Sequence, residues 1–174
     1  MVNQSDLTRK VKALFLTAII AGILMFIGMI SQAQEMPPRP VGIYYTQSLS
    51  FGAFSLGISG GSVTVYPSGI RSSTGGVVLL NLGYPFFPAI FNIEGNLGTV
   101  IHPLLGPDVT LTGSSGGSLT LHLETTDPGD PIIISVSPPG QISVKVGGTI
   151  YVGNQAANPP GFYSGFFSIM FIQE

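Results

Sequence analysis

The sequence predicts an all-β domain, an antiparallel β-sandwich or a barrel, that follows an N-terminal signal helix. Three observations support this fold class. Apolar and polar residues alternate with a period of two in several short segments. Turn-forming groups such as Gly-Gly, Pro-Gly and Pro-Ser-Gly separate these segments. No stretch after the N-terminal segment shows a sustained helical period, and many short strands at this spacing are typical of a sandwich or a barrel.

Residues 1–33 have the three parts of a secretory signal peptide. Basic residues come first, an uncharged apolar run covers Ala13–Ile30, and Ser31-Gln32-Ala33 places small residues at a cleavage position. We therefore expect cleavage after Ala33, so that the mature chain begins at Gln34. The alternative is an anchor that stays attached, since the apolar run just reaches the length that spans a bilayer. Either way, the sequence predicts an exported domain that works in the periplasm, at the cell surface or outside the cell.

The exported part is expected to consist of an extended arm over residues 34–48 and a β-sandwich over residues 49–174. Three prolines in the arm, Pro37, Pro38 and Pro40, disfavour a helix. Within the sandwich, leucines alternate with polar residues over Ser118–Glu124, which predicts a strand with one buried face. The other expected strands are Leu49–Phe54, Ser62–Tyr66, Gly76–Leu80, Ala89–Glu94, Val109–Thr112, Ile132–Val136, Gln141–Val146 and Gly148–Val152.

The last expected strand, Phe162–Ile172, is the most apolar segment of the exported part. A period of two places four apolar residues on one of its faces: Tyr163, Phe167, Ile169 and Phe171. The opposite face is also mostly apolar. Such a strand belongs in the middle of a sheet or in an interface, because an apolar strand at an open edge is an aggregation site. We predict that these four residues form the core or an assembly groove.

The composition limits both the stabilising chemistry and the partners. The chain has no cysteine, so the exported domain is held together without disulfides. Only 8% of the residues are charged and the net charge is slightly negative, which makes nucleic acid a poor partner. A surface with so little charge has weak colloidal repulsion. This indicates cover by like subunits, other surface proteins or a membrane, unless Ser, Thr, Asn and Gly supply enough polarity.

The sequence offers no residue set for catalysis, a cofactor or a metal ion. His102 and His122 fall on different segments, and no group of His, Cys, Asp and Glu has the spacing of metal ligands. Asp127 and Asp130 are better explained by a solvated turn than by a calcium loop. The segment Gly57–Gly61 only partly matches a nucleophile elbow and precedes no helix. We therefore expect a protein that is not an enzyme and that binds no cofactor or metal.

One loop is a candidate ligand site. Tyr84, Phe86 and Phe87 lie between turn residues, and exposed aromatic side chains in a loop are often contact sites. This predicts a module that binds a glycan or another surface ligand, unless the loop plugs one end of the sandwich. A small outer-membrane β-barrel is a further alternative, although the short strands and the few aromatic residues disfavour it.

Several segments together resemble a known family. They are Leu49–Phe54, Gly60–Val65, Pro67–Arg71, Pro88–Gly95, Val146–Val152 and Asn158–Ile169. Their order and spacing resemble the exported bacterial domain of unknown function family 4402, which is akin to spore coat protein U and to fimbrial subunits. The resemblance covers about residues 49–172. The chain departs from the family pattern at Phe166, Phe167 and the last five residues.

The resemblance implies an immunoglobulin-like β-sandwich without enzymatic activity. It also implies completion of the fold by a strand that a neighbouring subunit donates, and strand donation combines main-chain hydrogen bonds with pockets for alternate side chains. The candidate donor is Val41–Phe54. The function we expect is that of a structural or adhesive surface protein, a pilin-like or coat-like subunit that assembles through strand pairing.

Overall fold

The computed structural model describes residues 9, 12, 14–16 and 39–174. The expected cleavage site after Ala33 and residues 34–38 of the expected arm lie outside the described residues. The few described residues before residue 17 are helical. Among the residues described, no helix combines the length and the apolar character that a membrane crossing requires. Residues Arg39–Glu174 form a separate unit that contains all the strands.

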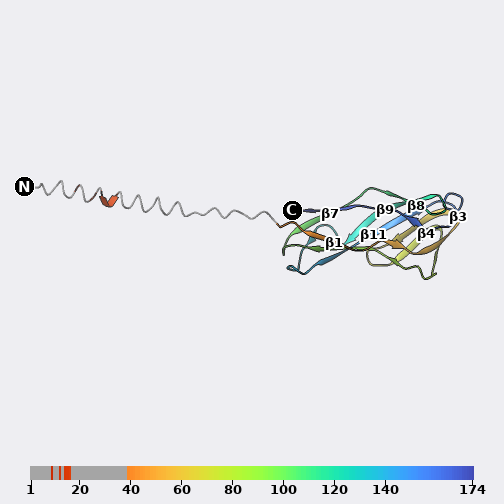
Figure 1. The fold of residues 1–174 in the computed structure, drawn as a ribbon, viewed down its shortest axis with the longest axis horizontal. Coiled ribbons are helices and arrows are strands. Elements are labelled where there is room, and N and C mark those ends of the chain that lie inside the picture. Colours follow the sequence, from red (N-terminus) through yellow and green to blue (C-terminus); the bar gives the residue numbers. More distant parts are fainter. Residues whose placement is uncertain (1–8, 10–11, 13, 17–38) are drawn as a thin grey trace, which may run out of the picture. The chain divides into compact units, whose positions relative to one another are not determined.

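Thirteen strands make up this unit in the described part of the chain (Figure 1). They are β1 (Gly42–Gln47), β2 (Ser50–Phe51), β3 (Ala53–Val65), β4 (Arg71–Leu80), β5 (Phe86–Phe87), β6 (Ala89–Glu94), β7 (Val100–Leu105), β8 (Val109–Gly113), β9 (Ser118–Asp127), β10 (Ile132–Ile133), β11 (Ile142–Val152), β12 (Tyr163–Ser164) and β13 (Ile169–Gln173).

The strands form antiparallel sheets in a sandwich-like arrangement. The largest sheet has the order β1-β6-β11-β9-β8-β12, and β3 also pairs with both β11 and β4. A second sheet has the order β10-β7-β13, and β2 pairs with β5. Every strand pair is antiparallel. The expected all-β antiparallel sandwich is therefore confirmed.

The core consists of two clusters of buried aliphatic side chains, which the alternating strands supply. In β9, Leu119, Leu121 and Leu123 are buried while the polar residues between them are exposed, as the sequence predicts. These leucines belong to the first cluster, with Val63, Val146 and other side chains. The second cluster contains Ile93, Ile101, Ile132, Ile134 and Val144.

Several segments differ from the sequence-based expectation. The expected strands Gln141–Val146 and Gly148–Val152 form the single strand β11, and β7 was not expected. Residues 42–47, expected to be part of the arm, instead form β1 and pair with β6. The prolines end at Pro40, and the β-prone residues that follow can enter the sheet. The segment Phe162–Ile172, expected as one strand, is divided into β12 and β13, which belong to different sheets. Both lie at sheet edges in the described structure, since β12 pairs only with β8 and β13 only with β7.

The long hairpin of β3 and β4 is irregular in its middle. Its register shifts between Leu56 and Gly61, and only the half of β3 after this shift pairs with β11. The backbones approach closely here, because a Cβ on Gly61 would lie 2.1 Å from the Thr74 carbonyl oxygen. Gly75 also has a φ of +65°, which favours glycine. The glycines therefore allow the close backbone approach at this irregularity, on either side of which the two halves of β3 have different partners.

Candidate functional site

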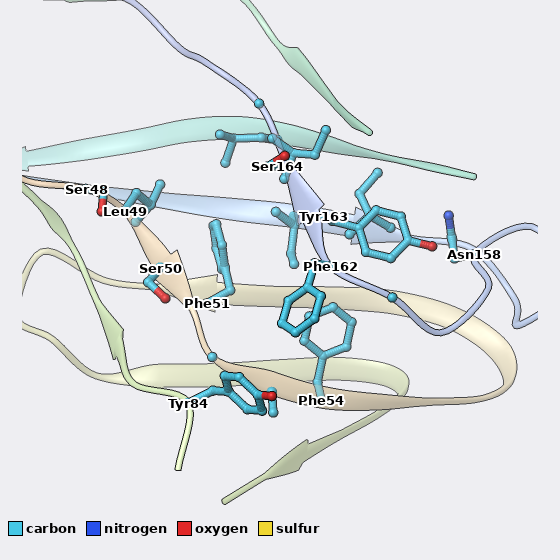
Figure 2. A pocket seen from close by; sticks show the side chains of 18 of the residues that line it. Ser48, Leu49, Ser50, Phe51, Phe54, Tyr84, Asn158, Phe162, Tyr163 and Ser164 are labelled. Carbon is cyan, nitrogen blue, oxygen red and sulfur yellow. The ribbon is translucent and has the colours of Figure 1, made fainter. Parts of the chain in front are cut away.

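An open apolar groove of about 1010 Å³ reaches the first core cluster from the side of the sandwich. Residues 48–56 line one wall, and residues 158–167 line the other. Figure 2 shows Phe51 and Phe54 on the first wall and Phe162 and Tyr163 on the second. Four buried core side chains contribute to the floor: Leu111, Leu119, Leu121 and Ile150.

The first wall is formed by β2, Gly52 and the beginning of β3. β2 pairs only with β5, and Ala53–Leu56 pairs only with β4 in the described structure. Gly52 bends the chain between the two strands with a φ of +67°. A Cβ at this position would lie 2.5 Å from Nη1 of Arg71, so glycine is required for both conformation and space. The strand edges of this wall are therefore hydrogen-bonded on one side only.

The second wall is held in place by hydrogen bonds at its beginning. The buried Asn158 donates from Nδ2 to the Ser118 carbonyl oxygen at 2.6 Å, and its Oδ1 accepts from Gly153 N at 2.5 Å. The Tyr163 hydroxyl donates to the Pro159 carbonyl oxygen at 2.7 Å. After these contacts, the chain pairs on one side only, through β12 and then β13.

Aromatic side chains lie at the mouth of the groove. The rings of Tyr84 and Phe162 meet edge to face with centroids 6.0 Å apart. Phe162 is 71% exposed and Phe166 is 97% exposed, so large apolar surfaces face solvent beside the opening. Such exposed aromatic surface marks a contact site in many proteins.

The structure places the candidate ligand loop next to this groove. Tyr84 lines the groove, whereas Phe86 and Phe87 form β5 and pair with β2 behind the first wall. Phe87 is half-buried, and the Phe86 ring lies 4.3 Å from the guanidinium carbon of Arg71. Of the three aromatic residues, Tyr84 alone belongs to the groove lining.

The four residues predicted for a core or groove all lie half-buried on the inner side of the C-terminal segment. Tyr163, Phe167 and Ile169 pack against the first cluster, and Phe171 packs against the second. Tyr163 and Phe167 also line the groove. The opposite face is exposed, as the 61% exposure of Met170 shows.

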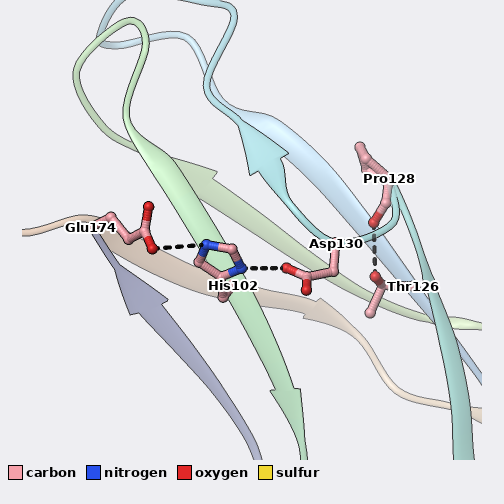
Figure 3. Close-up of polar contacts among 5 residues, drawn as sticks. All are labelled: His102, Thr126, Pro128, Asp130 and Glu174. Carbon is pink, nitrogen blue, oxygen red and sulfur yellow. Dashed lines mark hydrogen bonds and ion pairs between the residues drawn. The ribbon is translucent and has the colours of Figure 1, made fainter.

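The groove lining contains no charged residue, and the two histidines lie outside it. His102 Nδ1 lies 2.7 Å from Asp130 Oδ1, and its Nε2 lies 3.4 Å from Glu174 Oε1 (Figure 3). Beside them, the Thr126 hydroxyl donates to the Pro128 carbonyl oxygen, which closes the neighbouring turn. Within the part of the chain that the structure describes, no group of three or more His, Asp and Glu residues could hold a metal ion.

His122 forms a second exposed pair with Asp108, at 2.6 Å between Nδ1 and Oδ1. The hydrogen bond to Asp108 raises the pKa of His122 above its usual value. Both histidine pairs connect segments on the surface of the domain.

The sequence predicted Tyr163 and Phe167 as part of the core or of an assembly groove, but it did not predict the other residues that line the groove. The alternation in β9 shows that Leu119 and Leu121 point inward, and it carries no information on whether a second layer covers them. Asn158 and Gly52 were also missed as determinants of the walls. The pair of prolines after Asn158 and the isolated Gly52 between two apolar segments were the available signals.

Comparison with known proteins gives a family but no characterised relative. The model of a family described as "Domain of unknown function (DUF4402)" matches residues 42–172. Searches of the curated proteins and of the solved structures gave no significant match.

Proposed function

The chain belongs to the DUF4402 family, a domain of unknown function, and from this premise we propose that it is an exported structural or adhesive subunit. In this proposal the protein is not an enzyme. It assembles with like subunits or other surface proteins through β-strand pairing in the groove. The observation that carries the proposal is an apolar groove between two walls whose strands are hydrogen-bonded on one side only.

Strand addition satisfies both features of this groove. An inserted strand donates and accepts main-chain hydrogen bonds along a wall, and its alternate side chains point to the floor. The floor is aliphatic and the lining is uncharged, so an uncharged strand with apolar residues at alternate positions fits it. Burial of that apolar surface favours association by about 25 cal/mol per Å², against which the entropy cost of ordering two molecules must be set.

The candidate donor is Val41–Phe54 of a neighbouring copy, and β1 is the part of it that can be exchanged most easily. β1 pairs only with β6, and its register is irregular between Tyr45 and Gln47. Ile43, Tyr44 and Tyr45 remain 45–59% exposed, so β1 contributes little burial to its own domain. The whole segment is uncharged, in agreement with the uncharged groove.

The test is the molar mass of residues 34–174 in solution, measured by light scattering after size exclusion. We expect multimers, and we expect monomers when Ser55 in the groove wall is replaced by Glu. Ser55 lines the groove and is exposed between Phe54 and Leu56, which pack on the core. A charge at this position of the wall strand disfavours pairing with an incoming strand and does not disturb the core. Ser143→Glu is the matched control, because Ser143 is an exposed strand residue outside the groove. A monomeric wild-type protein would contradict the proposal.

Binding of a glycan or another surface ligand is the second candidate function. Its support is the edge-to-face pair of Tyr84 and Phe162 at the groove mouth, since sugars pack on exposed aromatic rings. A glycan screen with the wild type and Tyr84→Ala tests it. A ligand whose binding is lost in this variant, in a protein that stays monomeric, would favour this function over assembly.

A further inference from the structure

Arg71 connects two parts of the sandwich that lie far apart along the β3–β4 hairpin. It begins β4 and pairs with Val65, beside the turn of the hairpin. Its side chain nevertheless reaches the opposite end of the hairpin, where Ala53 pairs with Leu80. The hairpin is irregular at its glycines, and its two ends lie close enough for the Arg71 side chain to join them.

The guanidinium of Arg71 donates to three backbone carbonyl groups, two in the groove wall and one in the paired strand β4. Nη1 donates to the carbonyl oxygens of Phe51 at 2.8 Å and Ala53 at 3.2 Å, and Nη2 donates to that of Leu80 at 3.2 Å. The first two carbonyls flank Gly52, the bend of the wall. One side chain therefore fixes the backbone of the wall on both sides of its bend.

This placement of a cation is costly for the folded state. No carboxylate among the described residues is recorded as an ion-pair partner of Arg71, and its Nε is buried without a hydrogen bond. Partial compensation comes from the three carbonyls and from the Phe86 ring below the guanidinium. An apolar residue would avoid the cost of an unsatisfied buried polar atom but could not bind the wall carbonyls.

An apolar groove in water tends to close, since closure removes apolar surface from the solvent. Movement of Phe51 and Phe54 toward the floor would achieve this, because both side chains already contact the first cluster. A contact on the side of the wall that faces away from the floor must therefore hold the wall in place. Hydrogen bonds from Arg71 to the wall backbone have the geometry for this, since they fix Phe51 and Ala53 to the hairpin end that pairs with β11.

We propose that Arg71 is a positioning residue, which holds the wall at Phe51–Ala53 in place and keeps the groove open for a partner strand. This inference rests on the function proposed above, because an open groove has a role only if a partner strand binds in it. The position of the wall can be measured by itself, whether or not the protein assembles.

The experiment measures the distance between the walls in the purified exported protein. Spin labels are attached to Ser55→Cys and Phe166→Cys, which lie on opposite walls and are both exposed. The chain has no other cysteine, so labelling is specific. Dilution with unlabelled protein restricts double electron–electron resonance to distances within one subunit. Arg71→Met is the test variant, and Arg71→Gln replaces it if the first does not fold.

We expect a narrow distance distribution in the wild type, and a broadened and shifted one when Arg71 is replaced by Met or Gln. Arg71→Lys should restore part of the narrow distribution, because an ammonium group can donate to the wall carbonyls without matching their geometry. Arg39→Met, the same change at an exposed arginine, should leave the distribution unchanged. Val144→Ala, which destabilises the second core cluster away from the groove, should do the same.

Two results would overturn the proposal. One is an unchanged distribution in a folded Arg71→Met or Arg71→Gln protein. The other is equal broadening in Val144→Ala at the same loss of thermal stability, which would make the effect one of stability in general. A wild-type protein that stays monomeric would instead refute assembly in the groove, and the distance measurement on Arg71 would still decide the positioning role.

Discussion

Replacement of two leucines of β9 by alanine tests whether the groove reaches the core. Leu121 and Leu123 point to the same side of β9, are each 3% exposed and belong to the same core cluster. They differ in one respect, because Leu121 lines the groove and Leu123 does not. The pair is therefore matched in residue type, burial and secondary structure.

The expected cost follows from the two terms of a large-to-small substitution, the lost transfer free energy and the cavity that remains. At Leu123 the space is enclosed and both terms apply, so we expect a loss of about 4 kcal/mol. At Leu121 the space joins the open groove and only the transfer term remains, so we expect about 2 kcal/mol. For a domain of about 140 residues, these values correspond to decreases in Tm of about 14 °C and 7 °C.

Urea unfolding and calorimetry of residues 34–174 measure both variants. The reasoning would be refuted if Leu121→Ala cost as much as Leu123→Ala. Equal losses would mean that the space beside Leu121 is closed in solution, which would also remove the main support for strand addition in the groove.

Three further predictions concern the walls and the surface. Gly52→Ala should destabilise the domain by about 1–3 kcal/mol, because alanine is strained at positive φ and its Cβ collides with Arg71; an unchanged Tm would contradict this. Asn158→Ala should cost about 2 kcal/mol in urea unfolding, since it removes the two hydrogen bonds that this buried side chain makes with the backbone of Gly153 and Ser118. The raised pKa of His122 gives stability that is complete below its unfolded pKa of about 6.5 and is lost as the pH rises through the higher folded value. Asp108→Asn should weaken this pH dependence and lower the pKa of His122 in an NMR titration, although Glu124 also raises it. An unchanged titration curve would exclude the Asp108 pair as the main cause.

The groove gives a structural interpretation of the low number of charged residues. With 8% charged residues, none of which lines the groove, the chain keeps this surface free of the side chains that usually protect open strand edges. Met170 and Ile172 are likewise exposed on β13, which pairs on one side only. These features agree with a surface that is covered in an assembly, which is the function proposed here.

Much of the fold could be predicted from the local pattern of the sequence. The inward leucines of β9 and the inner residues of the C-terminal segment, such as Tyr163 and Phe171, follow from a period of two, because successive side chains of a strand point to opposite faces. In contrast, β7 was not predicted, because Pro103 interrupts its alternation of apolar and polar residues. Proline is tolerated there because β10 pairs only with Val100 and Ile101, which leaves Pro103 at an edge-like position.

The sequence by itself determined the strand alternation, the all-β class and the low charge and lack of disulfides, since these depend on residue type and local spacing. Only the tertiary structure decided which inward residues are covered. Leu121 and Leu123 are equivalent in sequence pattern, yet one lines a groove and the other does not. The irregularity of the β3–β4 hairpin and the reach of Arg71 from one hairpin end to the other were likewise decided by long-range pairing. Such pairing depends on contacts between residues far apart in the chain, which the local pattern does not specify.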